Sequence, residues 1–200
     1  MSPYAVSKLA GEYYCDVFAR QYALPVSILR FFNVYGPRQS ASTPYPAVIP
    51  AFIDSASRGA PLITHGDGLQ TRDFTYVDDV VHACVIAAVR GARGVFNVAA
   101  GCPVSIDYLA HAIIDLIDSS STIIHAPARK GDVRDSAADI GRLVALGYQP
   151  RIDILEGLAL TIDWARRLSP ESSNASAGKS VAGLPTRPQV PLPSSVPGGL

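Results

Sequence analysis

The hydrophobic positions of this chain recur with two different spacings, and the spacing predicts the local structure. Apolar residues three or four positions apart are typical of helices, whereas short runs rich in β-branched residues are typical of strands. Helices are therefore expected at residues 4–22, 48–58, 78–90, 106–117, 139–146 and 153–168. Strands are expected at residues 26–32, 61–64, 95–98 and 122–125. Because strands and helices alternate, the pattern predicts an α/β fold.

Residues with special backbone preferences mark the ends of these elements. Ser2 and Ser105 stand where a hydroxyl group can cap the helix that follows. Gly147 follows an expected helix end, where a left-handed backbone conformation is common. Residues 33–38 and 66–68 contain the glycines and polar residues that are typical of turns, so they are expected to form loops.

The composition divides the chain into two parts. Of the 200 residues, 48% are hydrophobic and 17% are charged, which is enough apolar surface for a sizeable core. Residues 169–200, however, hold six of the sixteen prolines, seven serines and no aromatic residue. Such a segment buries too little apolar surface to offset the entropy of ordering it. We expect a folded unit at residues 1–168 and a disordered Pro/Ser/Gly-rich tail at residues 169–200.

The charges balance, and the sequence shows no targeting feature. Seventeen basic and seventeen acidic residues give a formal net charge of zero, so there is no basic surplus for nucleic acid or an anionic membrane. No apolar run is long enough to span a membrane, and the first residues do not resemble a signal peptide. Cys15, Cys84 and Cys102 lack the spacing of a disulfide framework or a metal site. These features predict a soluble, cytoplasmic protein without nucleic-acid, membrane or metal partners.

Tyr4 and Lys8 are the first candidates for chemistry. Because they are four positions apart on an expected helix, their side chains project from the same face. A phenol is a weak base at neutral pH, and a neighbouring cation favours its phenolate form. Such a pair is suited to removing a proton from a substrate hydroxyl while hydride leaves the adjacent carbon. A chance pair on a helix surface is the alternative, and the pair alone does not decide between them.

Four segments resemble, in order, the motifs of one enzyme family. Residues 4–12 are similar to the catalytic helix of the extended short-chain dehydrogenase/reductases, and residues 29–38 to the strand and loop that follow it in the nucleotide-sugar branch. Residues 66–80 and 129–134 resemble that branch's sugar-nucleotide segment and its last substrate motif. The sequence is thus identified as a member of the NAD-dependent epimerase/dehydratase family, and the most similar branch is that of the UDP-glucose and UDP-N-acetylglucosamine 4-epimerases.

The resemblance implies a fold, a cofactor and a reaction. The fold would be the C-terminal part of a Rossmann-like protein with its small substrate-binding subdomain, and the N-terminal βαβ units would be absent. The cofactor would be NAD. The reaction would be epimerisation at C4 of a UDP-sugar, either UDP-glucose/UDP-galactose or the N-acetylated forms, through a 4-keto intermediate. The complete enzyme would be a homodimer whose interface includes the first helix.

On the cofactor side, the resemblance assigns roles to four residues. Tyr4 would be the catalytic acid/base, and Lys8 would hold the nicotinamide ribose beside it. Phe31 would line the nicotinamide pocket, and Phe32 would line the adjoining sugar pocket.

On the nucleotide side, it assigns five more. Asn33, Arg72 and Arg129 would contact the diphosphate, a task for which a planar guanidinium is suited. Asp132 would accept a hydrogen bond from a ribose hydroxyl, and the backbone around Val48 would meet the uracil. Without the motifs, these residues would be interpreted as a turn asparagine, surface arginines and a turn or helix-start aspartate.

The sequence departs from the family pattern at three points. His65 stands where relatives usually place an aromatic ring against the uracil, and an imidazole stacks more weakly. Ser136 stands where narrow-specificity glucose epimerases carry a tyrosine, which leaves room for an N-acetylated sugar. The G-x-x-G-x-x-G loop that binds the dinucleotide in this class does not occur in these 200 residues.

Two further functions stay open at this stage. Nucleotide-sugar dehydratases and UDP-glucuronate decarboxylases share the Tyr4–Lys8 pair, although residues 47–50 and 72–74 favour the epimerase branch. Alternatively, the chain is a non-catalytic remnant or an interaction fragment that associates through its first helix. The residues of that helix that would suit such a surface are Tyr13, Tyr14, Val17, Phe18 and Tyr22.

Overall fold

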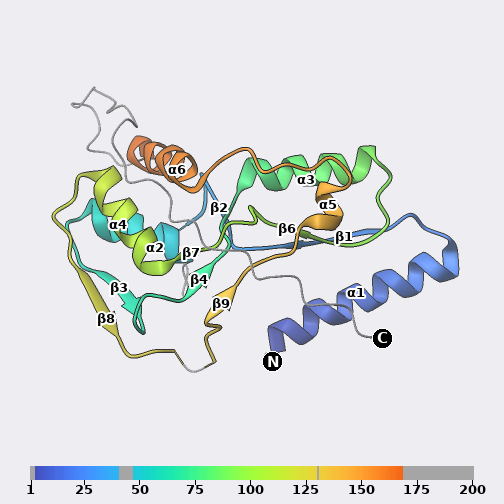
Figure 1. Cartoon of the computed structure of the whole chain (residues 1–200), viewed down its shortest axis with the longest axis horizontal. Helices are drawn as coiled ribbons and strands as arrows, with labels where there is room; N and C mark the ends of the chain where they lie inside the picture. Colours follow the sequence, from blue (N-terminus) through green and yellow to red (C-terminus); the bar gives the residue numbers. More distant parts are fainter. Residues whose placement is uncertain (1–2, 41–46, 130, 169–200) are drawn as a thin grey trace.

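The structure is a computed structural model that describes residues 3–40, 47–129 and 131–168. The expected cap at Ser2 and the expected tail at residues 169–200 lie outside the described residues. Helices and strands alternate within them, as the hydrophobic pattern predicts (Figure 1).

Each helix that the pattern predicts has a counterpart among the six described helices. They are α1 (Pro3–Tyr22), α2 (Val48–Ser57), α3 (Val77–Val89), α4 (Ile106–Ile117), α5 (Gly141–Val144) and α6 (Ile154–Leu168). The described strands are β1 (Ser27–Phe31), β2 (Val34–Tyr35), β3 (Leu62–His65), β4 (Thr71–Arg72), β5 (Thr75–Tyr76), β6 (Gly94–Val98), β7 (Val104–Ser105), β8 (Ile123–Ala126) and β9 (Asp135–Ser136).

One half of the molecule is built on the parallel pair β1–β6, in which Leu29 lies opposite Phe96. Helix α3 covers one face of this pair and α1 lies along the other (Figure 1). The core under α3 is built from Ala83 and Ala87 on the helix and from Val98 and Tyr148 below it. This half therefore has the alternating parallel arrangement of a Rossmann-like fold.

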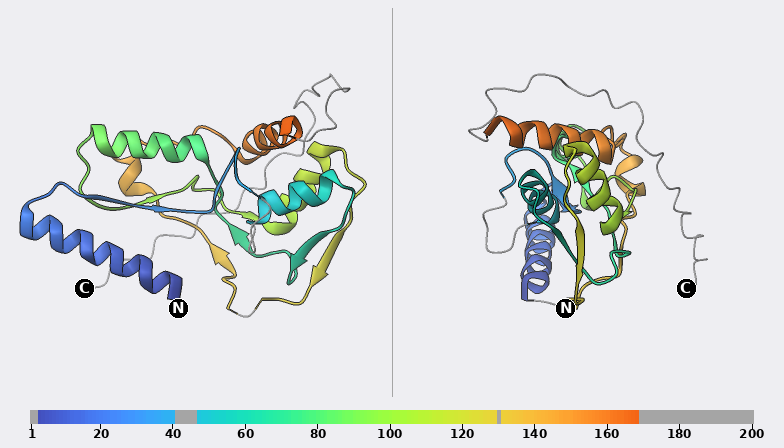
Figure 2. Two further views of the ribbon diagram at one scale, coloured as in Figure 1. Left: turned by 180° about the vertical axis from the view of Figure 1, so that it is seen from behind. Right: turned by 90° about the vertical axis from the view of Figure 1, so that its left-hand side faces the viewer.

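The other half is built on a second parallel pair, β3–β8, in which Leu62 lies opposite Ile123. Helices α2, α4 and α6 pack together beside this pair, as Figure 2 shows from two directions. Their shared core includes Ile49, Leu109 and Leu158, each of which is almost completely buried. Each of the three helices has an apolar side and a polar side, and the apolar side packs against this core.

Short strands connect the two halves. β2 pairs with β5 in parallel, and β4 lies between β7 and β9, antiparallel to the first and parallel to the second. The prediction of a loop throughout residues 33–38 is therefore wrong at β2. None of the five two-residue strands was expected, because two residues are too few to show an alternation of apolar and polar positions.

Two helix ends test the predicted boundaries. The Ser105 hydroxyl accepts a hydrogen bond from the backbone N–H of Tyr108 at 3.1 Å, which confirms the cap of α4. The expected helix at residues 139–146 is shorter than predicted, since α5 covers only Gly141–Val144. The Asp139 carboxylate accepts the N–H of Gly141 at 2.8 Å, so residue 139 forms a turn before the helix begins.

No helix among the described residues is both long and apolar enough to cross a membrane.

Candidate functional site

Tyr4 and Lys8 lie on one face of α1, as their spacing predicts. The ammonium nitrogen of Lys8 is 5.4 Å from the centre of the Tyr4 ring, and 71% of Tyr4 is exposed. The phenol and the ammonium group are therefore adjacent and open to a ligand. Both groups can donate hydrogen bonds to the hydroxyls of a ribose or a sugar.

Helix α1 is joined to the rest of the protein by a bidentate ion pair. Arg30 on β1 donates from Nε to Glu12 Oε1 at 2.7 Å and from Nη2 to Glu12 Oε2 at 2.5 Å. This hydrogen bonding, together with the charge of Arg30, lowers the pKa of Glu12 below its ordinary value. None of the described residues of α1 is buried. Glu12 and Arg30 thus fix where α1 sits beside β1.

Arg72, Asp132 and Ser136 come together at the β4–β9 pair. Arg72 lies opposite Ser136 in the register of the two parallel strands. The Arg72 guanidinium donates to the Asp132 carboxylate and also to the carbonyl oxygen of Thr71, at 2.7 Å. The structure therefore places three predicted nucleotide-site residues, far apart in sequence, within one small region.

The segment around residues 127–134 brings further predicted residues toward this region. His65, at the end of β3, has its Nδ1 atom 3.2 Å from the carbonyl oxygen of Pro127. Arg129 is exposed, and its carbonyl oxygen accepts the backbone N–H of Asp132 at 3.2 Å. Arg134 forms an ion pair with Asp67 at 2.8 Å, in the turn after β3. These contacts hold the Arg129–Asp132 turn beside the end of β3.

Asn33 and Val48 line a small cavity of about 140 Å³. β1 ends at Phe31, and Asn33 comes two residues later, directly after Phe32. The φ of Asn33 is positive, at 33°. Its side-chain amide donates to the carbonyl oxygen of Asp73 at 3.2 Å. Ligands of parallel α/β folds bind beyond the carboxyl ends of the strands, which is where Asn33 lies.

The two phenylalanines differ in exposure. Phe31 is 51% exposed at the end of β1, whereas Phe32 is partly buried. The Phe32 carbonyl oxygen accepts a hydrogen bond from the Thr75 hydroxyl at 2.8 Å. The end of β1 is therefore tied to β5, and the exposed ring of Phe31 is available to a ligand.

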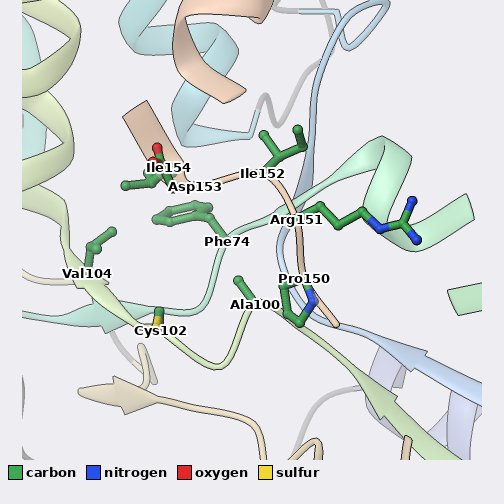
Figure 3. A pocket seen from close by; sticks show the side chains of 9 residues that line it. All are labelled: Phe74, Ala100, Cys102, Val104, Pro150, Arg151, Ile152, Asp153 and Ile154. Atoms are coloured by element: carbon green, nitrogen blue, oxygen red, sulfur yellow. The ribbon is translucent and has the colours of Figure 1, made fainter. Parts of the chain in front are cut away.

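A larger cavity of about 220 Å³ lies beside Phe74 and is lined by none of the predicted site residues. Figure 3 shows that its wall is mostly apolar, with Phe74, Ile152 and Ile154 around it and the Arg151 guanidinium directed away. Phe74 also lines the smaller cavity beside Asn33, so this residue contributes to the walls of both cavities.

Two buried carboxylates near this region were not among the predicted site residues. Asp73 and Asp79 are 0% and 1% exposed. Burial raises the pKa of Asp73, while backbone N–H groups that donate to its carboxylate act in the opposite direction. The sequence showed Asp73 only as an acidic residue next to Arg72, a few positions before the start of α3.

The arrangement can hold a phosphorylated, hydroxyl-rich ligand. Arg72 and Arg129 supply guanidinium groups, and Asp132 supplies an acceptor for hydroxyls. Among the described residues, no cluster of three or more histidine, cysteine or acidic side chains is arranged to hold a metal ion.

Comparison with known proteins shows the family and the fold. Residues 1–99 match the sequence profile of the NAD dependent epimerase/dehydratase family. A UDP-N-acetyl-alpha-D-glucosaminuronate decarboxylase of Bacillus cytotoxicus is 38% identical over 173 residues, which are 82% of this chain and 53% of that protein. The structure is similar to that of UDP-glucose 4-epimerase from Thermotoga maritima with UDP-glucose, with a TM-score of 0.79 and 36% identity over 84% of this chain and 54% of that one.

A second similar structure is Thermus thermophilus UDP-glucose 4-epimerase in complex with NAD, with a TM-score of 0.77 and 32% identity over 84% of this chain and 55% of that one. The chain thus spans about half the length of the proteins that it matches. Fold and site together define an α/β protein of the extended short-chain dehydrogenase/reductase type. Within that class, the chain belongs to the NAD-dependent epimerase/dehydratase family.

Proposed function

We propose that this chain carries the catalytic helix and the nucleotide-sugar side of an NAD-dependent UDP-sugar 4-epimerase. The observation that carries the proposal is the convergence of Arg72, Asp132 and Ser136 at the β4–β9 pair, in a chain that also presents Tyr4 beside Lys8. The similar solved structures that hold UDP-glucose and NAD support it.

Tyr4 would act on the proton of the sugar's C4 hydroxyl. Its phenol is exposed and lies beside the Lys8 ammonium, so both groups can reach a bound sugar hydroxyl. The same two side chains fit the NAD ribose, because they offer adjacent hydrogen-bond donors, and the exposed Phe31 ring offers an apolar wall for the nicotinamide. When bound, NAD supplies reversible hydride transfer at C4.

The nucleotide would be held at the other end of the site. Arg72 and Arg129 would pair with the diphosphate, Asp132 with a ribose hydroxyl, and Asn33 with a diphosphate oxygen. In the structure Arg72 is already oriented by Asp132, so its guanidinium has little conformational freedom left to lose when a ligand binds. Val48 and His65 would border the uracil.

Ser136 would set which sugars fit. It lies opposite Arg72 in the strand register, next to the proposed diphosphate, and its short side chain leaves room for an N-acetyl group at C2. The decarboxylase among the relatives acts on an N-acetylated uronate by its name, so decarboxylation of a UDP-uronate is the second candidate reaction.

The test is turnover of UDP-glucose and UDP-N-acetylglucosamine by the 200-residue chain with NAD. Tyr4→Phe should lower the rate by about 100-fold or more, because the acid/base group is lost. Tyr13→Phe is the matched control, since Tyr13 is a second exposed tyrosine of α1, and it should leave the rate unchanged. No binding of UDP by the wild-type chain, or equal rates for the two variants, would contradict the proposal.

We also propose that α1 forms the interface of a homodimer. The helix exposes four large side chains, each by at least 49%: Tyr13, Tyr14, Val17 and Phe18. A cluster of exposed apolar side chains is typical of an interface, and a second copy of the same helix would bury them. Sedimentation should show a dimer for the wild-type chain and a monomer for Phe18→Glu; a monomeric wild type would contradict this.

A further inference from the structure

The carboxylate of Asp73 contacts backbone groups from two separate loops. Its Oδ1 atom accepts the N–H of Ala100 at 3.1 Å, and its Oδ2 atom accepts the N–H groups of Gly101 at 3.1 Å and Ala138 at 3.4 Å. The backbone carbonyl of the same residue accepts the side-chain amide of Asn33 at 3.2 Å. Asp73 therefore links the ends of β1 and β6 to the segment that follows β9.

Such a buried carboxylate is costly to the fold. Asp73 is 0% exposed, and removing an ionised group from water is unfavourable unless strong hydrogen bonds replace its hydration. Among the residues that the structure describes, the groups that donate to this carboxylate are backbone N–H groups, including that of Cys102. A charged acceptor restrains the backbone N–H groups that donate to it, because such a hydrogen bond is stronger than one between neutral groups.

The loops that Asp73 fixes are the ones that carry proposed ligand contacts. Arg72 is the neighbour of Asp73 in the chain. Ala138 comes two residues after Ser136, so the bond from Ala138 to the Asp73 carboxylate restrains the strand that lies opposite Arg72. Loss of this carboxylate would shift Ser136 relative to Arg72. Asn33 bonds to the backbone carbonyl of Asp73, a contact that does not depend on the side chain.

We propose that Asp73 is a positioning residue of the nucleotide-sugar site, whose carboxylate holds Arg72 and Ser136 in register without touching the ligand. This inference rests on the proposed function for the identity of the ligand. The distances above carry it, because one carboxylate bonds to the backbone on both sides of the site.

Asp79 provides a matched control within the same molecule. It is also buried, at 1% exposure, and it also accepts two backbone N–H groups, from Arg151 at 3.0 Å and Ile152 at 3.2 Å. Those residues lead into α6, and they line the larger cavity of Figure 3. None of the proposed ligand contacts lies on the segment that Asp79 holds.

The experiment compares Asp73→Asn with Asp79→Asn in the 200-residue chain. Each substitution replaces one acceptor oxygen with an amide NH₂, so both are expected to lower the melting temperature. At a temperature where both variants are folded by circular dichroism, UDP titration calorimetry should show at least a 10-fold loss of affinity for Asp73→Asn and less than a 2-fold change for Asp79→Asn. Equal affinities in the two variants would overturn the positioning role.

Two further measurements keep the result decisive. If Asp73→Asn does not fold, Ala138→Pro removes only one of the donors, and it should weaken UDP binding several-fold; unchanged affinity would overturn the inference.

If the wild-type chain binds no UDP, the proposed function fails, and hydrogen exchange then decides the role of Asp73. Amide exchange across residues 132–138 should accelerate at least 10-fold in Asp73→Asn and not in Asp79→Asn; equal exchange would overturn the role.

Discussion

The guanidinium of Arg72 donates a hydrogen bond to the carboxylate of Asp132, sixty residues further along the chain. Arg72 is largely buried and Asp132 is partly exposed, so the pair sits at the edge of the site, where a ligand can reach it. A diphosphate that binds Arg72 must share the guanidinium with this carboxylate.

Asp132→Asn should therefore have opposite effects on two ligands. Removing the negative charge frees Arg72 and removes repulsion, so inorganic pyrophosphate should bind several-fold more tightly. The affinity for UDP should rise less than the affinity for pyrophosphate, or should fall, because the proposed acceptor for a ribose hydroxyl is weakened. Calorimetric titration of both ligands measures the difference. Equal changes for pyrophosphate and UDP would show that Asp132 has no role toward the ribose.

Ser136→Tyr tests the space beside the proposed diphosphate. Because Ser136 lies opposite Arg72, a tyrosine there would fill the volume expected for a C2 substituent. Affinity for UDP-N-acetylglucosamine should fall at least 10-fold, while affinity for UDP-glucose should stay within about 2-fold of the wild type. Ser136→Ala is the control and should change neither. An equal loss for both sugars would remove the argument for a size filter.

The Glu12–Arg30 pair makes the attachment of α1 dependent on pH. The pKa of Glu12 is lowered, so its contribution is present at pH values above the ordinary glutamate pKa and is lost as pH falls through the lowered value. An NMR titration should show the α1 amides changing together with the Glu12 carboxylate, below pH 4.5. Arg30→Gln should move the midpoint upward.

Arg20→Gln is the matched control for that titration. Arg20 pairs with Asp16 inside α1, at 3.0 Å, and so it cannot anchor the helix to β1. This variant should leave the Glu12 midpoint in place. A midpoint that is the same in Arg30→Gln and the wild type would mean that the pair does not anchor α1.

The packing of α6 depends on the absence of a side chain at Gly157. A Cβ atom there would lie 2.1 Å from the Tyr35 hydroxyl oxygen, and the Tyr35 ring is fixed by an edge contact with Tyr76 at 5.6 Å between ring centres. Gly157→Ala should lower the free energy of unfolding by about 1–3 kcal/mol in urea denaturation. Gly11→Ala, in the open face of α1, should not destabilise the protein, since alanine favours a helix and nothing lies within 4 Å. A destabilised Gly11→Ala or an unchanged Gly157→Ala would contradict this packing.

The long elements were predictable from the sequence, whereas the parts that assemble the site were not. Apolar periodicity sufficed for α4, and the Ser105 hydroxyl marked its start. The pairing of β4 with β9 depends on contacts between residues more than sixty positions apart, such as Arg72 and Ser136, and two-residue strands show no period. The burial of Asp73 could not be predicted either, because a buried acidic residue and an exposed one are identical in sequence. The motifs indicated which residues to propose as ligand contacts, and the fold shows which of these residues lie together.

We propose above all that this chain holds a nucleoside diphosphate through Arg72. Calorimetric titration of the purified chain with UDP and with uridine tests this proposal. We expect UDP to bind at least 10-fold more tightly than uridine, and we expect Arg72→Gln to abolish that difference. Arg58→Gln should preserve it, because Arg58 belongs to an exposed pair with Asp54 within the α2 region. Equal affinity for UDP and uridine in the wild-type chain, or an unchanged preference in Arg72→Gln, would contradict the account.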